Sequence, residues 1–144
     1  MSLEANAYDL LTAAERGEES PAGGRRFRRE DLRKPLLERY SLLHKAALSG
    51  KELRMGSREV QDVRALILLR DEIVHYKTEW RSSAKISKKL EALLHKRIPL
   101  NPYSCGEIFF PEQCVSGGSA QWAVNTARTF MLSFVVSTGY RKNI

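Results

Sequence analysis

The chain has 144 residues, of which 42% are hydrophobic and 28% charged, with a net charge of +7; this size and composition indicate one ordinary globular domain. Its two cysteines, Cys105 and Cys114, are too few for a disulfide framework and lack the paired spacing of a zinc site, so we expect no metal and no cofactor. The N-terminus does not resemble a signal peptide, and polar side chains interrupt the most apolar stretch, residues 120–136. We therefore expect a cytoplasmic protein without a membrane span.

The N-terminal residues predict a short helix followed by a linker. Residues 4–15 have helical spacing, with an expected apolar side formed by Ala5, Tyr8, Leu11 and Ala14. The glycine- and proline-rich residues 17–24 predict a flexible linker. We accordingly divide the chain into residues 1–24, a helix with its linker, and residues 25–144, a helical bundle domain.

Two longer helices are predicted next. The first runs from about Leu32 to Leu48, with Pro35 in its first turn, where the missing N–H does no harm, and Gly50 suits its left-handed end. The second begins after Ser57, a suitable N-cap, and extends to about Glu79.

A fourth helix is predicted from about Ala84 to Arg97, and Pro99 stops it. Residues 98–118 are expected to be irregular, with Phe109 and Phe110 packing this loop onto the core. A last helix, capped by Ser119, extends to about Ser137. No strand pattern of comparable strength occurs, so the predicted fold class is all-α, a bundle of four to five helices.

The third predicted helix carries a charged residue inside its apolar face. At about 100° per residue, the apolar side chains between Val60 and Trp80 cover an arc of about 200°, and Arg70 lies within this arc. A guanidinium stays charged and is costly to bury without partners. Two interpretations remain open: Arg70 makes an internal salt bridge or contacts to loop carbonyls, or it borders a cleft and binds an anion.

His75 lies on a different side of the same helix, about 140° from Arg70 around the axis. One straight helix therefore does not place the two side chains on one face. Joint action requires either a distorted helix or a symmetric partner that places its own copy opposite, and the second route predicts a homodimer. Tyr76 and Trp80 lie on the apolar arc and are expected in the core.

The segment LILLRDEIVHYKTEW, residues 66–80, resembles the signature of the HEPN superfamily, the higher eukaryote and prokaryote nucleotide-binding helical domains. In that signature an arginine is followed by Asn, Asp or His, and a histidine follows after a few variable residues. Arg70, Asp71 and His75 match this order with four residues between Arg and His, although Asn is commoner than Asp at the second position. The resemblance implies a HEPN-like helical bundle.

The resemblance also implies an activity, since many family members are metal-independent endoribonucleases that work as dimers. His75 would act as general base or acid on the ribose 2′-hydroxyl and the leaving oxygen. Arg70 would stabilise charge on the phosphoryl oxygens, and Asp71 would orient a neighbouring group. The implied product is a 2′,3′-cyclic phosphate.

Basic residues are concentrated in two segments. Residues 25–58 contain eleven Lys and Arg against four acids, and residues 81–97 contain six against one. This asymmetry suits a polyanion such as RNA, although basic side chains also simply solvate helix faces. The residues expected to contact RNA are Arg25, Arg26, Arg28, Arg29, Lys85, Lys88 and Lys89.

The alternative function is a non-catalytic HEPN-like module that binds nucleotide, RNA or a protein partner such as an antitoxin, as in toxin–antitoxin or defence systems. Leu68, Glu72 and Glu79 would then form a partner surface. The two functions differ in what they require of the motif. The enzyme needs Arg70 and His75 of two protomers to converge on one open cleft, whereas an internal ion pair of Arg70 beside a solvated His75 favours the module.

Overall fold

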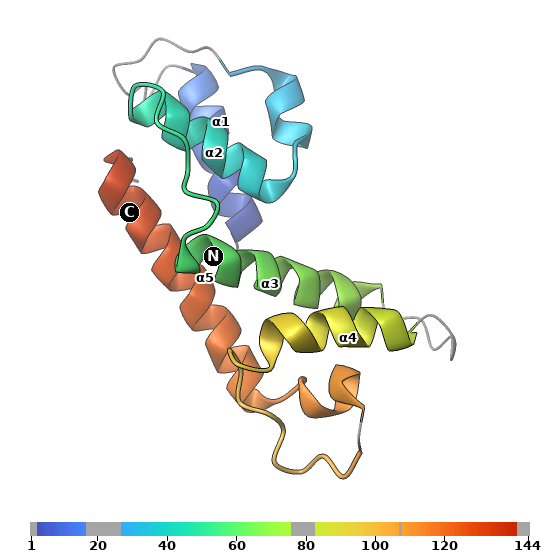
Figure 1. The fold of residues 1–144 in the computed structure, drawn as a ribbon. Helices are drawn as coiled ribbons and strands as arrows, with labels where there is room; N and C mark the ends of the chain where they lie inside the picture. Colours follow the sequence, from blue (N-terminus) through green and yellow to red (C-terminus); the bar gives the residue numbers. More distant parts are fainter. Residues whose placement is uncertain (1–2, 17–26, 76–82, 107, 141–144) are drawn as a thin grey trace. The chain divides into compact units, whose positions relative to one another are not determined.

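The computed structural model describes residues 3–16, 27–75, 83–106 and 108–140, and within these ranges every regular element is a helix (Figure 1). The predicted all-α class is therefore confirmed for the described part of the chain. No helix in these ranges combines the length and apolarity needed to cross a membrane. The elements are α1 (Leu3–Arg16), η1 (Arg29–Arg33), α2 (Leu36–Ala47), α3 (Arg58–Val74), α4 (Ser83–Leu94), η2 (Phe109–Gln113) and α5 (Gly117–Thr138).

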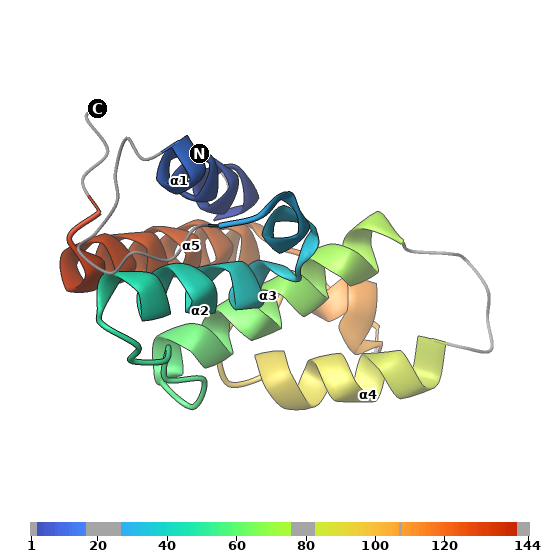
Figure 2. The same ribbon diagram turned by 90° about the horizontal axis from the view of Figure 1, so that it is seen from above.

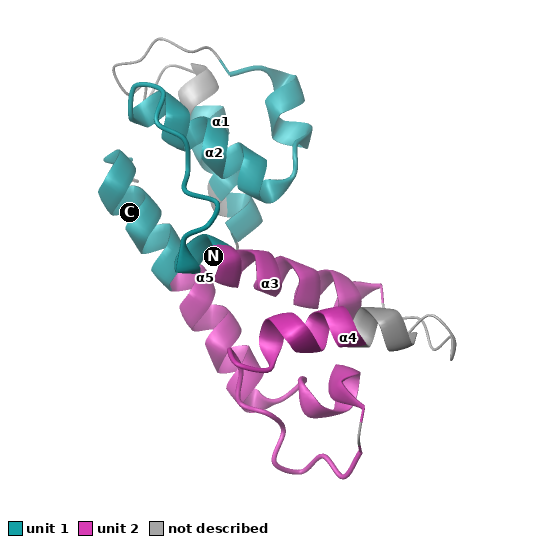
Figure 3. Ribbon diagram, viewed as in Figure 1, with its two compact units in different colours: residues 1–60, 129–144 teal, residues 61–128 magenta. Residues whose placement is uncertain are grey.

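The helices form two compact units, shown in separate colours in Figure 3. Unit 1 consists of residues 1–60 and 129–144, and unit 2 consists of residues 61–128. Unit 2 is thus a continuous segment inserted between the two parts of unit 1. The predicted boundary after residue 24 falls inside unit 1, and α1, on its N-terminal side, packs against α2.

Unit 1 is built around an aromatic cluster. Tyr40 of α2 is fully buried, and its ring lies edge-on to Phe130 and Phe134 of α5, with centroids 4.8 and 4.9 Å away. The Tyr40 hydroxyl donates a hydrogen bond to the Leu3 carbonyl oxygen at 3.1 Å, which ties α1 to α2. Burial raises the pKa of Tyr40 well above its usual value, because the phenolate would lose its hydration.

The face that α1 buries matches the predicted one only in part: Leu11 is buried as predicted, and the side chain of Ala14 lies outside the described residues. Tyr8, expected on the apolar side, is 50% exposed, and Ala5 is exposed as well. Among the side chains of α1 that the structure describes, the buried ones are Leu3, Ala7, Leu10 and Leu11, a set with i, i+4, i+7 and i+8 spacing. The burial of the adjacent Leu10 and Leu11 is favoured over the burial of Tyr8, because the tyrosine hydroxyl is more favourable in water.

The predicted start of the second helix at Leu32 is wrong. Residues Arg29–Arg33 form a short 3-10 turn, Lys34 is extended, and α2 begins after Pro35. Proline disfavours the helical conformation in the residue before it, so Lys34 cannot continue the turn into α2. At the other end Gly50 has the expected left-handed conformation, with φ of 92°, and Ser49 has a positive φ of 51°.

Unit 2 is built on α3 and α4, which run antiparallel beside one another (Figure 2). The core residues that α3 and α4 contribute are aliphatic. Phe109 and Phe110 of η2 pack against them, as predicted for this loop. The Arg97 guanidinium, just beyond α4, donates to the Asp62 carboxylate of α3 at 2.7 Å. The buried cluster consists of Ala65, Leu69, Leu90, Leu94, Ile98, Phe109, Phe110 and Cys114.

Ser116 and Ser119 form reciprocal hydrogen bonds that cap the N-terminus of α5. The Ser119 N–H donates to Ser116 Oγ at 3.1 Å, and the Ser116 N–H donates to Ser119 Oγ at 2.9 Å. Ser116 is therefore the capping residue, directly before the start of α5 at Gly117, where the prediction had placed the cap at Ser119. Gly139, with φ of 73°, follows the end of the helix as expected.

Candidate functional site

The C-terminal half of α3 is only partly covered by its own unit. Val63 and Leu69 are buried, but Ile73 and Val74 are 50% and 60% exposed. The apolar arc predicted from the sequence therefore continues to the end of α3, whereas its burial does not. Tyr76 and Trp80, which extend the arc, lie outside the described residues.

Arg70 lies in this partly covered region, and its side chain is exposed. Its guanidinium donates to the carboxylate of the neighbouring Asp71 at 2.8 Å, and both side chains are about half exposed, at 54% and 45%. The pair with Asp71 is thus a surface contact and not the internal salt bridge that the sequence left open. An exposed ion pair of this kind contributes little net stability.

His75 follows directly after α3 and is exposed. Its backbone N–H donates to the Asp71 carbonyl oxygen at 2.9 Å, so the helical hydrogen bonding continues through this residue. Arg70 and His75 consequently keep the separation of about 140° around the axis that the sequence predicts. The structure brings Arg70 together with Asp71, and it directs His75 to another side of the helix.

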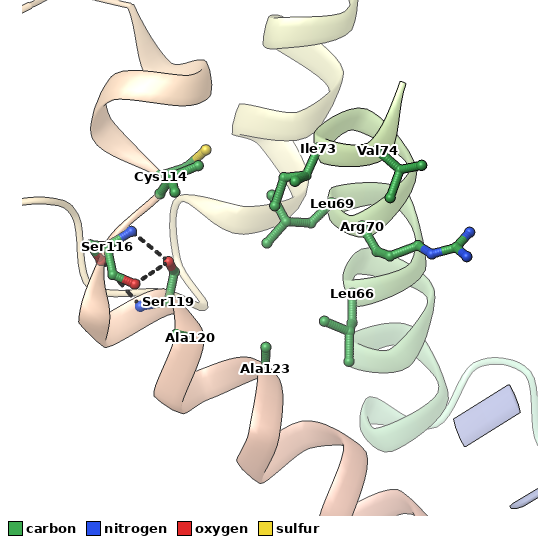
Figure 4. Close-up of a pocket in the computed structure, with 11 residues that line it drawn as sticks. Leu66, Leu69, Arg70, Ile73, Val74, Cys114, Ser116, Ser119, Ala120 and Ala123 are labelled. Atoms are coloured by element: carbon green, nitrogen blue, oxygen red, sulfur yellow. Dashed lines mark hydrogen bonds between the residues drawn. The ribbon is translucent and has the colours of Figure 1, made fainter. Parts of the chain in front are cut away.

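A pocket of about 290 Å³ opens beside the same stretch of α3, within unit 2 (Figure 4). One wall comes from α3, and the other comes from the loop before α5 and from the first turns of α5. Leu66 points into the space between the walls, whereas the Arg70 guanidinium extends away from α5, so that only its stem lines the pocket. The lining residues are Leu66, Leu69, Arg70, Ile73, Val74, Cys114, Val115, Ser116, Ser119, Ala120 and Ala123.

The serine and cysteine side chains of the pocket are already engaged or unreactive. The hydroxyls of Ser116 and Ser119 accept the capping hydrogen bonds at the start of α5, and Ser119 Oγ also donates to the Ser116 carbonyl. Burial raises the pKa of the Cys114 thiol to about 11, so this side chain stays protonated and apolar at neutral pH. The pocket therefore suits apolar groups, and its lining residues offer no cluster of ligands for a metal ion.

The residues predicted to contact RNA are distributed over both units. Arg28 and Arg29 are exposed in unit 1, and Lys88 and Lys89 are exposed on α4 in unit 2. Arg25, Arg26 and the side chain of Lys85 lie outside the described residues. The four described cations are thus accessible to solvent.

Sequence reasoning missed the second wall of the pocket. We expected residues 98–118 to be an irregular loop, and nothing in its composition indicated that Cys114 and Val115 would face α3. One usable signal was the Ser-x-x-Ser pattern at residues 116–119 ahead of an apolar run, which fixes where the chain turns into α5.

In comparisons with protein-family models, with curated protein sequences and with solved structures, nothing matches this chain. Function is therefore inferred from the residues of α3 and their surroundings.

Proposed function

We propose that the chain is a HEPN-type, metal-independent endoribonuclease that acts as a homodimer. The observation that carries the proposal is the accessibility of the motif at one end of α3, where Arg70 and His75 are exposed and the Asp71 side chain is about half exposed. The motif also lies next to an apolar pocket whose rim is exposed. A motif with only a structural role would be expected to be buried or locked internally, and here each polar group is within reach of a ligand.

In the proposed reaction a His75 imidazole removes the proton from a ribose 2′-hydroxyl. The 2′-oxygen attacks the adjacent phosphorus, the bond to the 5′-oxygen breaks, and that oxygen takes up a proton from an imidazolium. The products are a 2′,3′-cyclic phosphate and a 5′-hydroxyl. The imidazolium formed in the first transfer is the acid of the second, so the proton balances and each site needs one His75.

Arg70 in this proposal stabilises the negative charge on the phosphoryl oxygens, for which its planar donor fork is suited. Asp71, 2.8 Å from the guanidinium, holds Arg70 in place until a phosphate competes for it. The separation of Arg70 and His75 around α3 makes it necessary that the two come from different protomers. The apolar rim, with Ile73 and Val74 at least half exposed, supplies the surface for such a contact.

The decisive experiment is a cleavage assay on single-stranded RNA with the His75→Ala variant. We expect the cleavage rate to fall by roughly 100-fold or more, because one imidazole accounts for that much of general acid–base catalysis. His95→Ala is the matched control, since His95 is also exposed and belongs to the same unit. Equal activity of wild type and His75→Ala would refute the catalytic role, and loss of activity in EDTA would refute the metal-free mechanism.

A mixing experiment tests the shared site. Arg70→Ala and His75→Ala are each expected to be inactive, but a mixed dimer would contain one site with both native side chains. Mixing the two variants under conditions of subunit exchange should therefore recover part of the wild-type rate. No recovery, with exchange verified by mass, would mean that each site is built from one chain.

The second candidate is a non-catalytic HEPN-like module that binds a protein partner or RNA. The observation that favours it is the pocket, which is apolar and open and whose serine hydroxyls are engaged in capping, as in surfaces that receive an apolar side chain of another protein. An inactive wild type that still forms a stable complex with RNA or with a partner would support this candidate.

A further inference from the structure

The turn η1 in unit 1 presents three arginines to solvent. Arg28, Arg29 and Arg33 are all exposed, and they fall within six consecutive residues. Glu30 is the exposed acid among them, so the outward-facing side of the turn has an excess of two positive charges. Arg25 and Arg26, which precede the turn, lie outside the described residues.

The turn is fastened from the inside by the carboxylate of Asp31, which is 6% exposed. One carboxylate oxygen of Asp31 accepts the Arg28 N–H at 3.0 Å, and the other accepts the Lys34 ammonium at 2.7 Å. The Asp31 N–H in turn donates to the Arg28 carbonyl at 2.8 Å. The negative charge of Asp31 is therefore neutralised by Lys34, and the Asp31 carboxylate fixes the backbone that carries the arginines.

Two further contacts hold the ends of the turn. Phe27, which precedes Arg28, is buried, with 6% of its surface exposed. At the other end the Arg39 guanidinium of α2 donates to the Lys34 carbonyl at 2.8 Å. The backbone from residue 27 to residue 34 is thus anchored at three places, while the arginine side chains between the anchors remain outside.

We infer that Arg28, Arg29 and Arg33 form a built phosphate-contact site for the backbone of single-stranded RNA, with Asp31 as its positioning residue. The inference rests on the proposed function for the identity of the polyanion. A basic turn whose backbone is already ordered loses less conformational entropy on binding than a flexible run of the same charge. Guanidinium groups also bind phosphate oxygens through two parallel hydrogen bonds, which gives the site a geometry and not only a charge.

The first test measures the salt dependence of RNA binding. Binding of a fluorescent single-stranded RNA to the full chain carrying His75→Ala is followed over a series of NaCl concentrations. Each phosphate contact contributes about 0.7 to the slope of log K against log salt, so replacing all three arginines with alanine should make the slope less negative by about 2. Arg33→Ala should account for about 0.7 of this change.

Arg54→Ala is the matched control, because Arg54 is exposed, belongs to unit 1 and lies outside the turn. It removes the same charge and should leave the slope within the experimental error. If Arg54→Ala and Arg33→Ala change the slope equally, only the net charge matters and the built site is refuted.

The second test asks whether Asp31→Ala strengthens or weakens RNA binding, because charge and geometry predict opposite changes in affinity. Asp31→Ala removes an acid, so a purely electrostatic interaction predicts tighter RNA binding. We expect weaker binding, because the variant loses the hydrogen bonds that order the turn. Tighter binding by a folded Asp31→Ala variant would overturn the role of Asp31.

A charge-conserving variant keeps the inference testable if Asp31→Ala does not fold. Replacing Arg28, Arg29 and Arg33 with lysine preserves the charge and removes the donor forks. We expect this variant to bind RNA several-fold more weakly than the parent, and equal affinity would overturn the geometric claim.

These outcomes are distinguishable from a failure of the proposed function. Loss of RNA binding in the turn variants with no cleavage by the wild type would refute the nuclease and leave the phosphate-contact site intact. Unchanged RNA binding in the turn variants would refute the site and leave cleavage unaffected.

Vesicles of phosphatidylcholine with phosphatidylserine provide a further arm. An effect of the turn variants on vesicle binding alone would assign the turn to a lipid surface and overturn the RNA proposal.

Discussion

Unit 1 encloses its aromatic cluster of Tyr40, Phe130 and Phe134, whereas unit 2 leaves aliphatic side chains at the edge of an open pocket. Tyr40, Phe130 and Phe134 are all nearly or fully buried and pack edge-to-face or stacked against each other. At the end of α3, by contrast, Ile73 and Val74 are at least half exposed.

The difference separates the parts of the molecule that stabilise it from the part that is available to a partner. Edge-to-face aromatic contacts add to the free energy of folding beyond their buried area. Half-exposed aliphatic side chains contribute less to folding and more to association, because their remaining area can still be removed from water. Arg70, Asp71 and His75 lie in the second kind of region.

The largest expected effect is on stability. Phe134→Ala should lower the free energy of unfolding by about 3–5 kcal/mol, because it opens a cavity in the aromatic cluster of unit 1. Val74→Ala, which shortens an exposed side chain of unit 2, should change it by less than about 0.5 kcal/mol. Urea denaturation of both variants measures the contrast. Equal losses in the two variants would remove the distinction between the two regions.

Alkaline pH should weaken unit 1 through Tyr40. The pKa of Tyr40 is raised in the folded state, so the folded protein keeps this proton more tightly than the unfolded chain does. The resulting stabilisation is complete below the ordinary tyrosine pKa of about 10 and declines as the pH rises above it.

Tyr40→Phe should reduce this decline and lower stability at neutral pH by about 1 kcal/mol, through loss of the hydrogen bond to the Leu3 carbonyl. Thermal unfolding at a series of pH values checks both effects, and Tyr103→Phe, at a position 89% exposed, is the control. A pH profile of Tyr40→Phe identical to that of the wild type would contradict the assignment to Tyr40.

The smallest effect concerns Cys114, which lines the pocket in unit 2. Cys114 is buried with its pKa raised to about 11, whereas Cys105 is exposed. At pH 8 iodoacetamide should therefore modify Cys105 at least roughly tenfold faster than Cys114, since the thiolate is the reactive form. Mass spectrometry of the labelled peptides measures the ratio. Comparable rates would show that the Cys114 thiol is accessible to solvent.

The helices themselves could be predicted from the sequence better than their surroundings. Helical spacing, Gly50, Gly139 and the Phe109–Phe110 pair identified where helices end and which loop packs inward, because each of these signals is local. The start of α2 differs from the predicted one, because Pro35 keeps Lys34 extended.

For the candidate site, periodicity placed Arg70 on the apolar arc but did not decide between an internal salt bridge and an accessible side chain. That choice depends on what covers the arc, and the neighbours of α3 at that point come from residues 114–123, far away along the chain. Periodicity describes one helix at a time and does not indicate how much of its apolar face another segment covers.

The insertion of unit 2 into unit 1 has a consequence for the order in which the molecule can form during synthesis. Tyr40 meets Phe134, 94 positions later, whereas the pairings of α3 with α4 in unit 2 span far shorter stretches of chain. A nascent polypeptide can therefore assemble the middle of its sequence while Tyr40 of α2 still lacks its aromatic partners. This helix would expose apolar surface until residues 130–134 are translated, and this interval is when a chaperone would be most useful to the chain.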